Sequence, residues 1–201
     1  MYKRQVKANS NLSLLKLIAS QGMGFDVVSK GELHRAIKAG ANTKKIVYSG
    51  VGKTKEEIAY ALNNKILCFN VESEEELVAI NAQASLMKLK ADISIRINPD
   101  VKVKTHPYIS TGMRENKFGI AYEDAFEIYK KAKQLDSINI VGIDFHIGSQ
   151  IMSIEPYLDS ISSVKKLIHK LDTIDIKLSH IDVGGGLGIS YKGEKLVDKS
   201  E

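Results

Sequence analysis

The sequence predicts an α/β fold in which parallel strands alternate with helices, and within that class an incomplete (β/α)₈ barrel of the TIM type. Short apolar runs rich in β-branched residues recur along the chain, and most are separated by stretches with helical spacing of apolar residues. Three glycines, Gly184 to Gly186, follow the last of these runs. Short connections of this kind are typical of a parallel sheet with helical crossovers.

Seven strands are expected along the chain. The first is the short run that ends near Lys7, and the others contain FDVVS, KIVYSG, ILCFNV, DISIRIN, NIVGIDFH and KLSHIDV. An open doubly wound sheet places its glycine-rich turn after the first strand, whereas a barrel places its phosphate site after late strands, as here. A closed barrel has eight strands and about 250 residues. We therefore expect about seven of the eight strands, in a single domain over residues 1–201 that is a fragment or needs a partner to close.

Helix boundaries can be read from capping residues. A first helix is expected to start near Asn11, and Gly22 and Gly40 stand where a left-handed residue ends a helix. Ser/Thr-x-x-Glu capping boxes predict three further starts, at Ser29 to Glu32, Thr54 to Glu57 and Ser73 to Glu76. After Pro156, apolar residues at steps of three and four predict one buried stripe, made of Tyr157, Ile161, Val164, Ile168 and Leu171.

Composition indicates an ordinary globular chain of 201 residues, 43% hydrophobic and 26% charged. It contains no run of eighteen apolar residues and no apolar signal segment near its start, so we expect no membrane partner and a cytoplasmic location. The net charge is +5, but the lysines are scattered at helical spacing, so we expect no nucleic-acid partner. The single cysteine, Cys68, lies in an apolar run and is expected to be a buried thiol.

Polar residues follow the expected strands at their carboxyl ends, where parallel barrels bind ligands. They are Lys7, Asn9, Asp26, Ser29, Ser49, Asn70, Arg96, Asn98, His146, Ser149 and Asp182. One long irregular stretch, Pro99 to Gly119, is expected to be functional or disordered, because loops of that length are uncommon in compact domains.

The glycines Gly184 to Gly186 favour a phosphate site, because consecutive N–H groups without side chains form a concave anion site. The alternative is a tight strand-to-helix turn, although one glycine suffices for a turn. A dinucleotide-binding pattern does not fit, because Ile189 and Tyr191 stand where its third glycine is required. The stretch SGVGKTKEE does not fit a P-loop, because Val47 occupies the position of its first glycine. Lys53 and Lys55 are interpreted as first-turn neighbours of the Thr54 cap.

His146 ends a strand in which Gly142 and Asp144 share its face, and it is expected to face the ligand. Lys7 alone would be interpreted as a surface lysine. A phosphate cradle, an imidazole and an amine at strand ends together fit a phosphorylated aldehyde such as pyridoxal 5'-phosphate, which an amine holds as a Schiff base. No metal is expected.

Five motifs resemble those of the pyridoxal-phosphate barrel domain of bacterial diaminopimelate decarboxylases, in the alanine-racemase-like fold group. They are VKAN, FDVVSKGEL, RINPDVKVKTHPYISTGMRENKFGI, GIDFHIGSQ and HIDVGGGLGISY, between about Val6 and Tyr191. Related ornithine, arginine and carboxynorspermidine decarboxylases share the lysine, histidine and glycine motifs but not the long third motif. The resemblance is thus specific to the diaminopimelate enzymes.

The resemblance implies a role for each matching residue. Lys7 would hold the cofactor as a Schiff base, and His146 would stack on its ring. Ser149 and Gly184, Gly185 and Gly186 would bind the phosphate, while Asp26 and Arg96 would orient the lysine and the histidine. The reaction implied is decarboxylation of meso-2,6-diaminopimelate to L-lysine and CO₂, with a small-molecule amino acid as substrate and a homodimer for the full-length protein.

Departures from the family pattern bear on activity. Lys3 to Gln5 replaces the aromatic and small residues that continue the first strand in the family. The family's eighth strand, with its Glu-Pro-Gly-Arg motif, and its C-terminal β-domain are not found, so we expect no turnover from these residues alone. A non-catalytic pyridoxal-phosphate carrier or regulatory homologue, and a barrel module that serves only assembly, are the alternatives.

Overall fold

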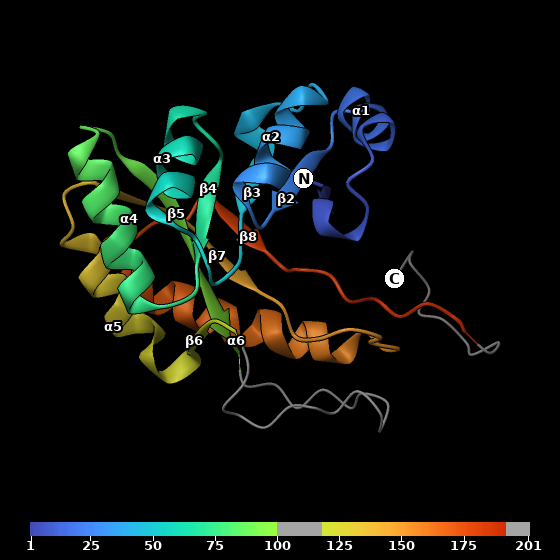
Figure 1. The fold of residues 1–201 in the computed structure, drawn as a ribbon. Helices are drawn as coiled ribbons and strands as arrows, with labels where there is room; N and C mark the ends of the chain where they lie inside the picture. Colours follow the sequence, from blue (N-terminus) through green and yellow to red (C-terminus); the bar gives the residue numbers. More distant parts are fainter. Residues whose placement is uncertain (100–117, 192–201) are drawn as a thin grey trace. The chain divides into compact units, whose positions relative to one another are not determined.

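Strands and helices alternate along the chain in the computed structural model, which describes residues 1–99 and 118–191 (Figure 1). The strands are β1 (Lys3–Gln5), β2 (Gly24–Val27), β3 (Ile46–Tyr48), β4 (Cys68–Val71), β5 (Ala91–Asn98), β6 (Ile120–Ala121), β7 (Ile138–Phe145) and β8 (His180–Asp182). The α-helices are α1 (Leu12–Ser20), α2 (Lys30–Lys38), α3 (Lys55–Asn63), α4 (Glu74–Leu86), α5 (Tyr122–Lys133) and α6 (Glu155–Asp172). Short 3₁₀ turns, η1 (Val6–Ala8) and η2 (Thr43–Lys45), precede α1 and β3.

The strands are hydrogen-bonded in the order β1-β2-β3-β4-β5-β7-β8, and β6 pairs with β5. Neighbours follow the chain without the reversal that marks a doubly wound sheet. The prediction of a partial (β/α)₈ barrel is therefore confirmed, and each of the seven expected strands is present. The sequence did not predict β6, because a strand of two residues has no readable periodicity. Most of the irregular stretch Pro99 to Gly119 lies outside the described residues.

The chain divides into two compact units that share strands β5 and β7. The first contains Met1–Ser94 and Lys130–Val141, and the second contains the described residues of Ile95–Tyr129 and Gly142–Glu201. The single domain expected over residues 1–201 stays a prediction. Each unit is described by itself below.

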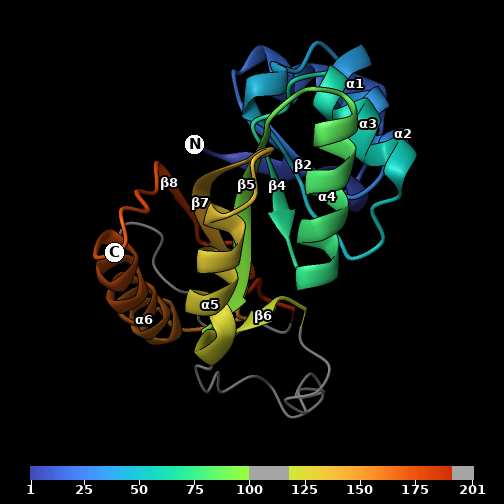
Figure 2. The same ribbon diagram turned by 90° about the vertical axis from the view of Figure 1, so that its left-hand side faces the viewer.

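In the first unit, strands β1, β2 and β3 each pair in parallel with the next strand, and the paired residues lie 21 positions apart in the sequence. The register pairs are Lys3 with Gly24, Phe25 with Ile46, and Val47 with Cys68. Side chains on these strands and on the inner faces of the helices are fully buried, among them Phe25, Ile46, Ile58, Leu77 and Ile80. Burial of each such side chain contributes about 1.5–3 kcal/mol. Helix α4 runs along β4 (Figure 2).

Lys3 to Gln5 forms strand β1 in spite of its polar sequence. Backbone hydrogen bonds hold a strand without regard to side-chain type, and β1 pairs with β2 so that Gln5 lies opposite Asp26. The buried Val6 follows directly and anchors the chain in the core. The departure from the family pattern at these positions therefore leaves the first strand intact.

The predicted helix boundaries are confirmed. The Asn11 side chain accepts hydrogen bonds from two N–H groups of α1, and Ser29, Thr54 and Ser73 each accept one from the glutamate three residues later. The reciprocal capping box is complete at Thr54 and Glu57. In the other two, the glutamate accepts instead from the residue before the cap, Val28 for Glu32 and Glu72 for Glu76. Gly22 and Gly40 end α1 and α2 with φ of 72° and 86°.

In the second unit, β7 pairs with β8 and β5 pairs with β6. Ile143 and Phe145 of β7 are fully buried, as expected for the face opposite His146. The stripe predicted on α6 is partly wrong: the buried residues are Tyr157, Ser160, Val164, Leu167 and Leu171, while Ile161 is 42% exposed. Ser160 can be buried because its hydroxyl donates to the Pro156 carbonyl within the helix, at 2.7 Å.

Candidate functional site

Lys7 and Asp26 lie at the carboxyl ends of neighbouring strands in the first unit. Lys7 is on the 3₁₀ turn that follows β1, and its side chain is exposed. Asp26 is half-buried in β2 and faces Gln5, two residues before Lys7. The structure therefore places the predicted amine and the predicted carboxylate at the same edge of adjacent strands.

A buried polar network lies at the carboxyl ends of β3 and β4. The Lys53 side chain is only 1% exposed, and its Nζ donates to the carbonyls of Gly50 (2.6 Å) and Asn70 (2.9 Å). It also forms an ion pair with Glu76, whose other carboxylate oxygen accepts from the Glu72 N–H at 2.8 Å. Lys53 stands directly before the Thr54 cap, as interpreted, but its ammonium group is enclosed by three acceptors from different segments.

Three other side chains complete this network. The Glu72 carboxylate accepts from the Gly50 N–H at 2.8 Å, and the Asn70 amide donates to the Ser49 hydroxyl at 3.1 Å. Burial raises the pKa of Glu76, although the Lys53 ammonium and the Glu72 N–H oppose that effect. The network holds the β3–α3 loop against the end of β4. Sequence spacing gives no sign of it, since its members come from the β3–α3 loop, strand β4, the β4–α4 loop and helix α4.

In the second unit, Arg96 of β5 and Asp144 of β7 form an ion pair. The distance from Arg96 Nε to Asp144 Oδ2 is 3.7 Å, and both side chains are largely buried, at 15% and 8% exposed. The Arg96 guanidinium also lies 5.9 Å from the centre of the Phe118 ring. Arg96 is therefore held in place at the end of its strand.

His146 lies at the end of β7, against the glycine turn that follows β8. The Gly185 N–H donates to His146 Nδ1 at 3.4 Å, and the Gly184 N–H donates to the Asp182 carboxylate at 3.1 Å. In β8, two residues before Asp182, His180 lies opposite Gly142 of β7. Its ring covers Gly142, where an added Cβ would meet the ring at 2.4 Å. The sequence did not single out His180, although a glycine inside a strand often marks close approach of this kind.

The glycine turn shows why small residues are required there. Gly184 and Gly186 have φ of 69° and 103°, and added Cβ atoms would meet Phe145 O at 2.6 Å and Gly148 O at 1.9 Å. Two of the three glycines are therefore required by the protein's own backbone, in agreement with the tight-turn alternative. A Cβ at Gly185 would meet nothing within 4 Å, so the turn is open at that point.

The loop after His146 is fastened to the chain after the glycine turn. Ile151 N–H donates to Gly186 O and Gly188 N–H donates to Ile151 O, both at 2.9 Å. The Gln150 amide both donates to and accepts from the Ile189 backbone, at 3.0 Å. Ser149 lies in this loop and is exposed. The second unit thus brings together His146, the glycine turn and the loop that carries Ser149.

The residues fit a phosphorylated ring in one specific respect. Gly184 and Gly185 already donate within the protein, whereas the Gly186 N–H has no acceptor among residues 1–99 and 118–191. This donor lies next to the open position at Gly185 and close to the imidazole of His146. A phosphate oxygen would satisfy it.

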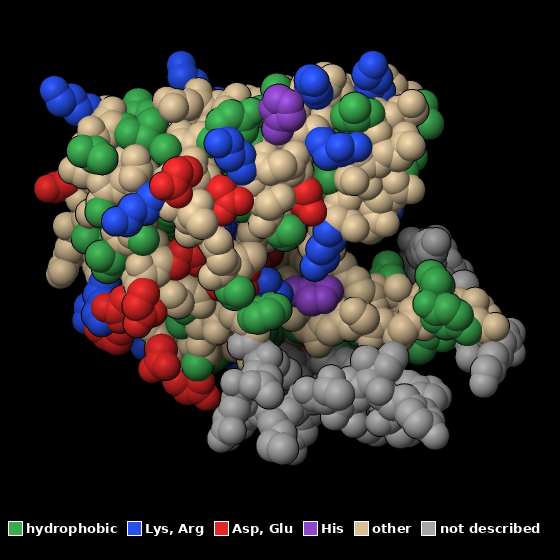
Figure 3. Space-filling model, in the orientation of Figure 1, with side chains coloured by type: hydrophobic (Ala, Val, Ile, Leu, Met, Phe, Trp, Pro, Cys, Tyr) green, Lys and Arg blue, Asp and Glu red, His purple; other side chains and the backbone are tan. Residues whose placement is uncertain are grey.

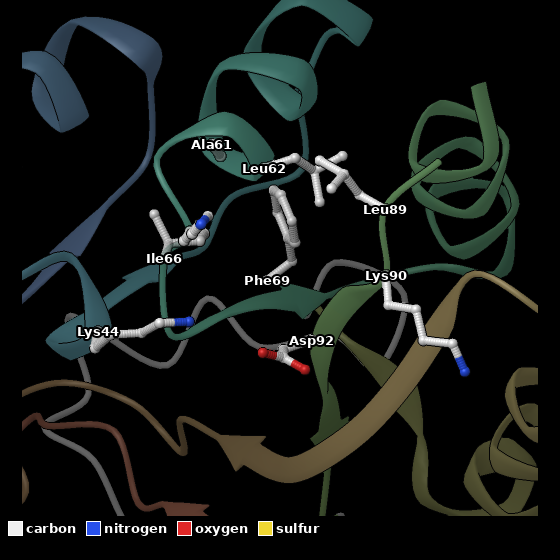
Figure 4. Close-up of a pocket in the computed structure, with 9 residues that line it drawn as sticks. Lys44, Ala61, Leu62, Ile66, Phe69, Leu89, Lys90 and Asp92 are labelled. Atoms are coloured by element: carbon white, nitrogen blue, oxygen red, sulfur yellow. The ribbon is translucent and has the colours of Figure 1, made fainter. Parts of the chain in front are cut away.

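A pocket of about 100 Å³ lies elsewhere in the first unit (Figure 4). Its lining contains apolar and charged side chains; the apolar ones are Ala61, Leu62, Ile66, Phe69 and Leu89, and the charged ones are Lys44, Lys65, Lys90 and Asp92. Most of these residues lie before β3, β4 and β5 or at the end of α3. It belongs to the amino ends of the strands, and none of the predicted site residues lines it.

On the face shown in Figure 3, lysine and arginine side chains are dispersed among other types. Among residues 1–99 and 118–191, no group of three or more His, Cys, Asp or Glu side chains could hold a metal ion. In the same residues, no helix has both the length and the apolar composition needed to span a membrane.

Comparison with known proteins gives one consistent result. Residues 4–201 match the family described as pyridoxal-dependent decarboxylase, pyridoxal binding domain. The chain is 51% identical over 196 residues to the diaminopimelate decarboxylase of Vibrio cholerae and 48% identical over 190 residues to that of Pseudomonas aeruginosa. These alignments cover 98% and 94% of this chain but 47% and 46% of the relatives. The chain therefore spans about half the length of the curated relatives it matches.

Among solved structures, the chain is similar to diaminopimelate decarboxylase from Helicobacter pylori complexed with L-lysine. The TM-score is 0.93 and the identity is 46%, over 98% of this chain and 50% of that one. The resemblance expected from the five motifs is confirmed.

Proposed function

We propose that this chain, which belongs to the pyridoxal-dependent decarboxylases as their pyridoxal-binding domain, serves the decarboxylation of meso-2,6-diaminopimelate to L-lysine and CO₂. The family's cofactor is pyridoxal 5'-phosphate. The identities of 48–51% to diaminopimelate decarboxylases over nearly the whole chain support the choice of substrate. The observation that carries the proposal is the glycine turn beside His146, where the Gly186 N–H has no acceptor within the described part of the chain.

The proposed roles follow from the side chains and their positions. When bound, pyridoxal phosphate supplies an acceptor for the electron pair released as the carboxyl group leaves. Lys7 supplies the amine that holds the aldehyde, and its exposure at the end of β1 leaves it accessible. Asp26, on the adjacent strand, would orient that amine.

His146 would provide the flat face on which the ring rests. Because its Nδ1 accepts from the Gly185 N–H, a neutral imidazole carries its proton on Nε2. The ring therefore cannot rotate without losing that bond. Asp144 would hold the Arg96 guanidinium in a fixed position near the end of β5.

Ser149 and the glycine turn would bind the phosphate. The Gly186 N–H and the Ser149 hydroxyl are donors on two loops that are hydrogen-bonded to each other through Ile151. Donors fixed in this way lose little conformational freedom when an anion binds. A role in lysine biosynthesis, a cytoplasmic location and a homodimer for the full-length protein belong to the same proposal. Sedimentation of that protein would test the dimer.

Lysine labelling tests the proposal directly. The purified chain is mixed with pyridoxal phosphate, reduced with borohydride, digested and analysed by mass spectrometry. We expect the pyridoxyl group on Lys7, loss of that label in Lys7→Ala, and retention in the control Lys44→Ala, an exposed lysine before β3. Labelling spread equally over surface lysines would contradict the proposal.

Release of CO₂ from meso-diaminopimelate tests the substrate. Turnover is measured with carboxyl-labelled substrate, for these 201 residues and for the longest form of the protein. We expect turnover from the longest form and none from the 201 residues alone. If the longest form released CO₂ from ornithine or arginine and not from diaminopimelate, the proposed specificity would be wrong.

A further inference from the structure

Tyr157 contacts the glycine turn from the first turn of helix α6, a helix labelled in Figure 2. Its hydroxyl donates to the Gly185 carbonyl at 2.9 Å, and the side chain is largely buried, with the residue 8% exposed. Burial raises the pKa of Tyr157, so the hydroxyl keeps its proton and remains a donor. The contact joins α6 to the turn within the second unit.

The contact matters because a peptide unit flanked by glycines is otherwise easily rotated. Gly184 and Gly186 adopt positive φ, and glycine occupies both sides of the φ/ψ map with little cost. Packing against Phe145 O and Gly148 O restrains the Cα positions of these two residues. It does not determine the direction of the peptide between Gly185 and Gly186.

The direction of that peptide determines where one N–H points. The Gly185 carbonyl and the Gly186 N–H belong to the same planar trans peptide, so they point in opposite directions. Because Tyr157 holds the carbonyl on its own side, the Gly186 N–H is turned away from α6. This is the N–H without an acceptor among the described residues of the chain.

We propose that Tyr157 is a positioning residue that aims the Gly186 N–H at the phosphate of the ligand. This inference rests on the proposed function, since it deepens the description of the same phosphate site. The next peptide is held from its carbonyl in the same way, because Ile151 N–H donates to Gly186 O. Tyr157 thus completes a pair of contacts that orient two successive peptides of the turn.

Tyr157→Phe removes the donor and keeps the buried ring. The matched control is Tyr122→Phe, because Tyr122 hydroxyl donates to the Ser163 carbonyl of α6 at the same 2.9 Å. Each variant loses one tyrosine-to-carbonyl hydrogen bond in the second unit, but only Tyr157 contacts the glycine turn. Thermal melting of both variants without ligand shows whether either has lost its fold.

The experiment compares pyridoxal phosphate with pyridoxal, which lacks the phosphate. We expect Tyr157→Phe to bind pyridoxal phosphate about three- to tenfold more weakly, as for loss of one hydrogen bond. Its affinity for pyridoxal should be unchanged, and Tyr122→Phe should match the wild type with both ligands. An equal loss for both ligands, or an unchanged preference for the phosphorylated one, would overturn the inference.

A second measurement keeps the inference separate from the proposed function. With ¹⁵N-glycine-labelled chain, inorganic phosphate should shift the Gly186 amide resonance of the wild type and shift it less in Tyr157→Phe. A Gly186 resonance that does not respond to phosphate in the wild type would refute the role of Tyr157, while labelling of Lys7 would still support the cofactor site.

Discussion

Replacement of Lys53 by methionine should strongly destabilise the first unit. Methionine has a similar length and no charge, so Lys53→Met fills much of the same space but leaves the Glu76 carboxylate without its cation. The carbonyls of Gly50 and Asn70 also lose their donor. Because Lys53 is 1% exposed and Glu76 is 11% exposed, water cannot readily replace the ammonium group.

The expected loss follows from the burial of this pair. Removal of one partner of a buried ion pair costs about 3–5 kcal/mol, because the remaining charge is uncompensated. Lys53→Met with Glu76→Gln should recover a large part of this loss, since glutamine is neutral and can still accept from the Glu72 N–H. The control Lys131→Met removes a surface pair with Glu74, also on α4, whose side chains are 54% and 43% exposed. That change should cost less than about 1 kcal/mol.

The loss should shrink as the pH falls. Burial raises the pKa of Glu76 above its ordinary value of 4.5, so the folded state holds this proton more tightly than the unfolded state. Stability therefore falls as pH rises through the folded-state pKa, by about 1.4 kcal/mol per pH unit within that window. Lys53→Met removes the cation that lowers this pKa, so the window extends to higher pH in the variant.

Urea denaturation followed by circular dichroism, at pH 7.0 and at about pH 5.5, measures both effects. We expect the difference between wild type and Lys53→Met to be larger at the higher pH. A difference below about 1 kcal/mol, as for a surface pair, or one that does not change with pH, would refute the view that Glu76 is left as a buried charge.

Three further substitutions test the second unit. Gly186→Ala should lower the free energy of unfolding by at least about 3 kcal/mol, because its Cβ would meet Gly148 O at 1.9 Å at a φ of 103°. Gly185→Ala should change it by less than about 1 kcal/mol, because its Cβ would meet nothing within 4 Å. Thermal melting measures both variants, and equal melting temperatures would contradict the packing described. Tyr129→Phe should cost about 1–3 kcal/mol near neutral pH, because the fully buried hydroxyl donates to the Gly142 carbonyl at 2.9 Å. Burial raises the pKa of Tyr129 well above its ordinary value. The stability that the neutral hydroxyl contributes is therefore lost as pH rises above about 10. Urea denaturation in that pH range should show a flatter pH dependence of stability for Tyr129→Phe than for the wild type.

The sequence was sufficient to predict the elements whose signals are local. Apolar runs with β-branched residues marked the strands, and capping residues such as Asn11 and Thr54 marked the helix starts within a residue. Strand β6 was missed because two residues show no pattern in the sequence, and only their pairing with β5 identifies them as a strand. The buried stripe of α6 was misplaced by one position at Ile161, because the small Ser160 faces the core instead.

The candidate site was predictable only in part, since its geometry depends on contacts between distant segments. Lys53 is buried because Gly50, Asn70 and Glu76 enclose it, and no spacing along the chain indicates that arrangement. The three glycines were interpreted as a cradle of equivalent N–H groups. The structure separates them, since Gly184 accommodates the Phe145 carbonyl at the end of β7 and Gly186 accommodates the Gly148 carbonyl in the loop after β7.

The constant 21-residue offset between paired strands in the first unit bears on how this protein is made. Each new strand closes a loop of the same length as the one before, so the entropic cost of every addition is nearly equal. During synthesis, β2 can dock on β1, β3 on β2 and β4 on β3 as soon as each leaves the ribosome, because none has to wait for a distant segment. The ladder of strands can therefore grow in the direction of translation, and few hydrophobic edges need stay exposed while the rest of the chain is completed.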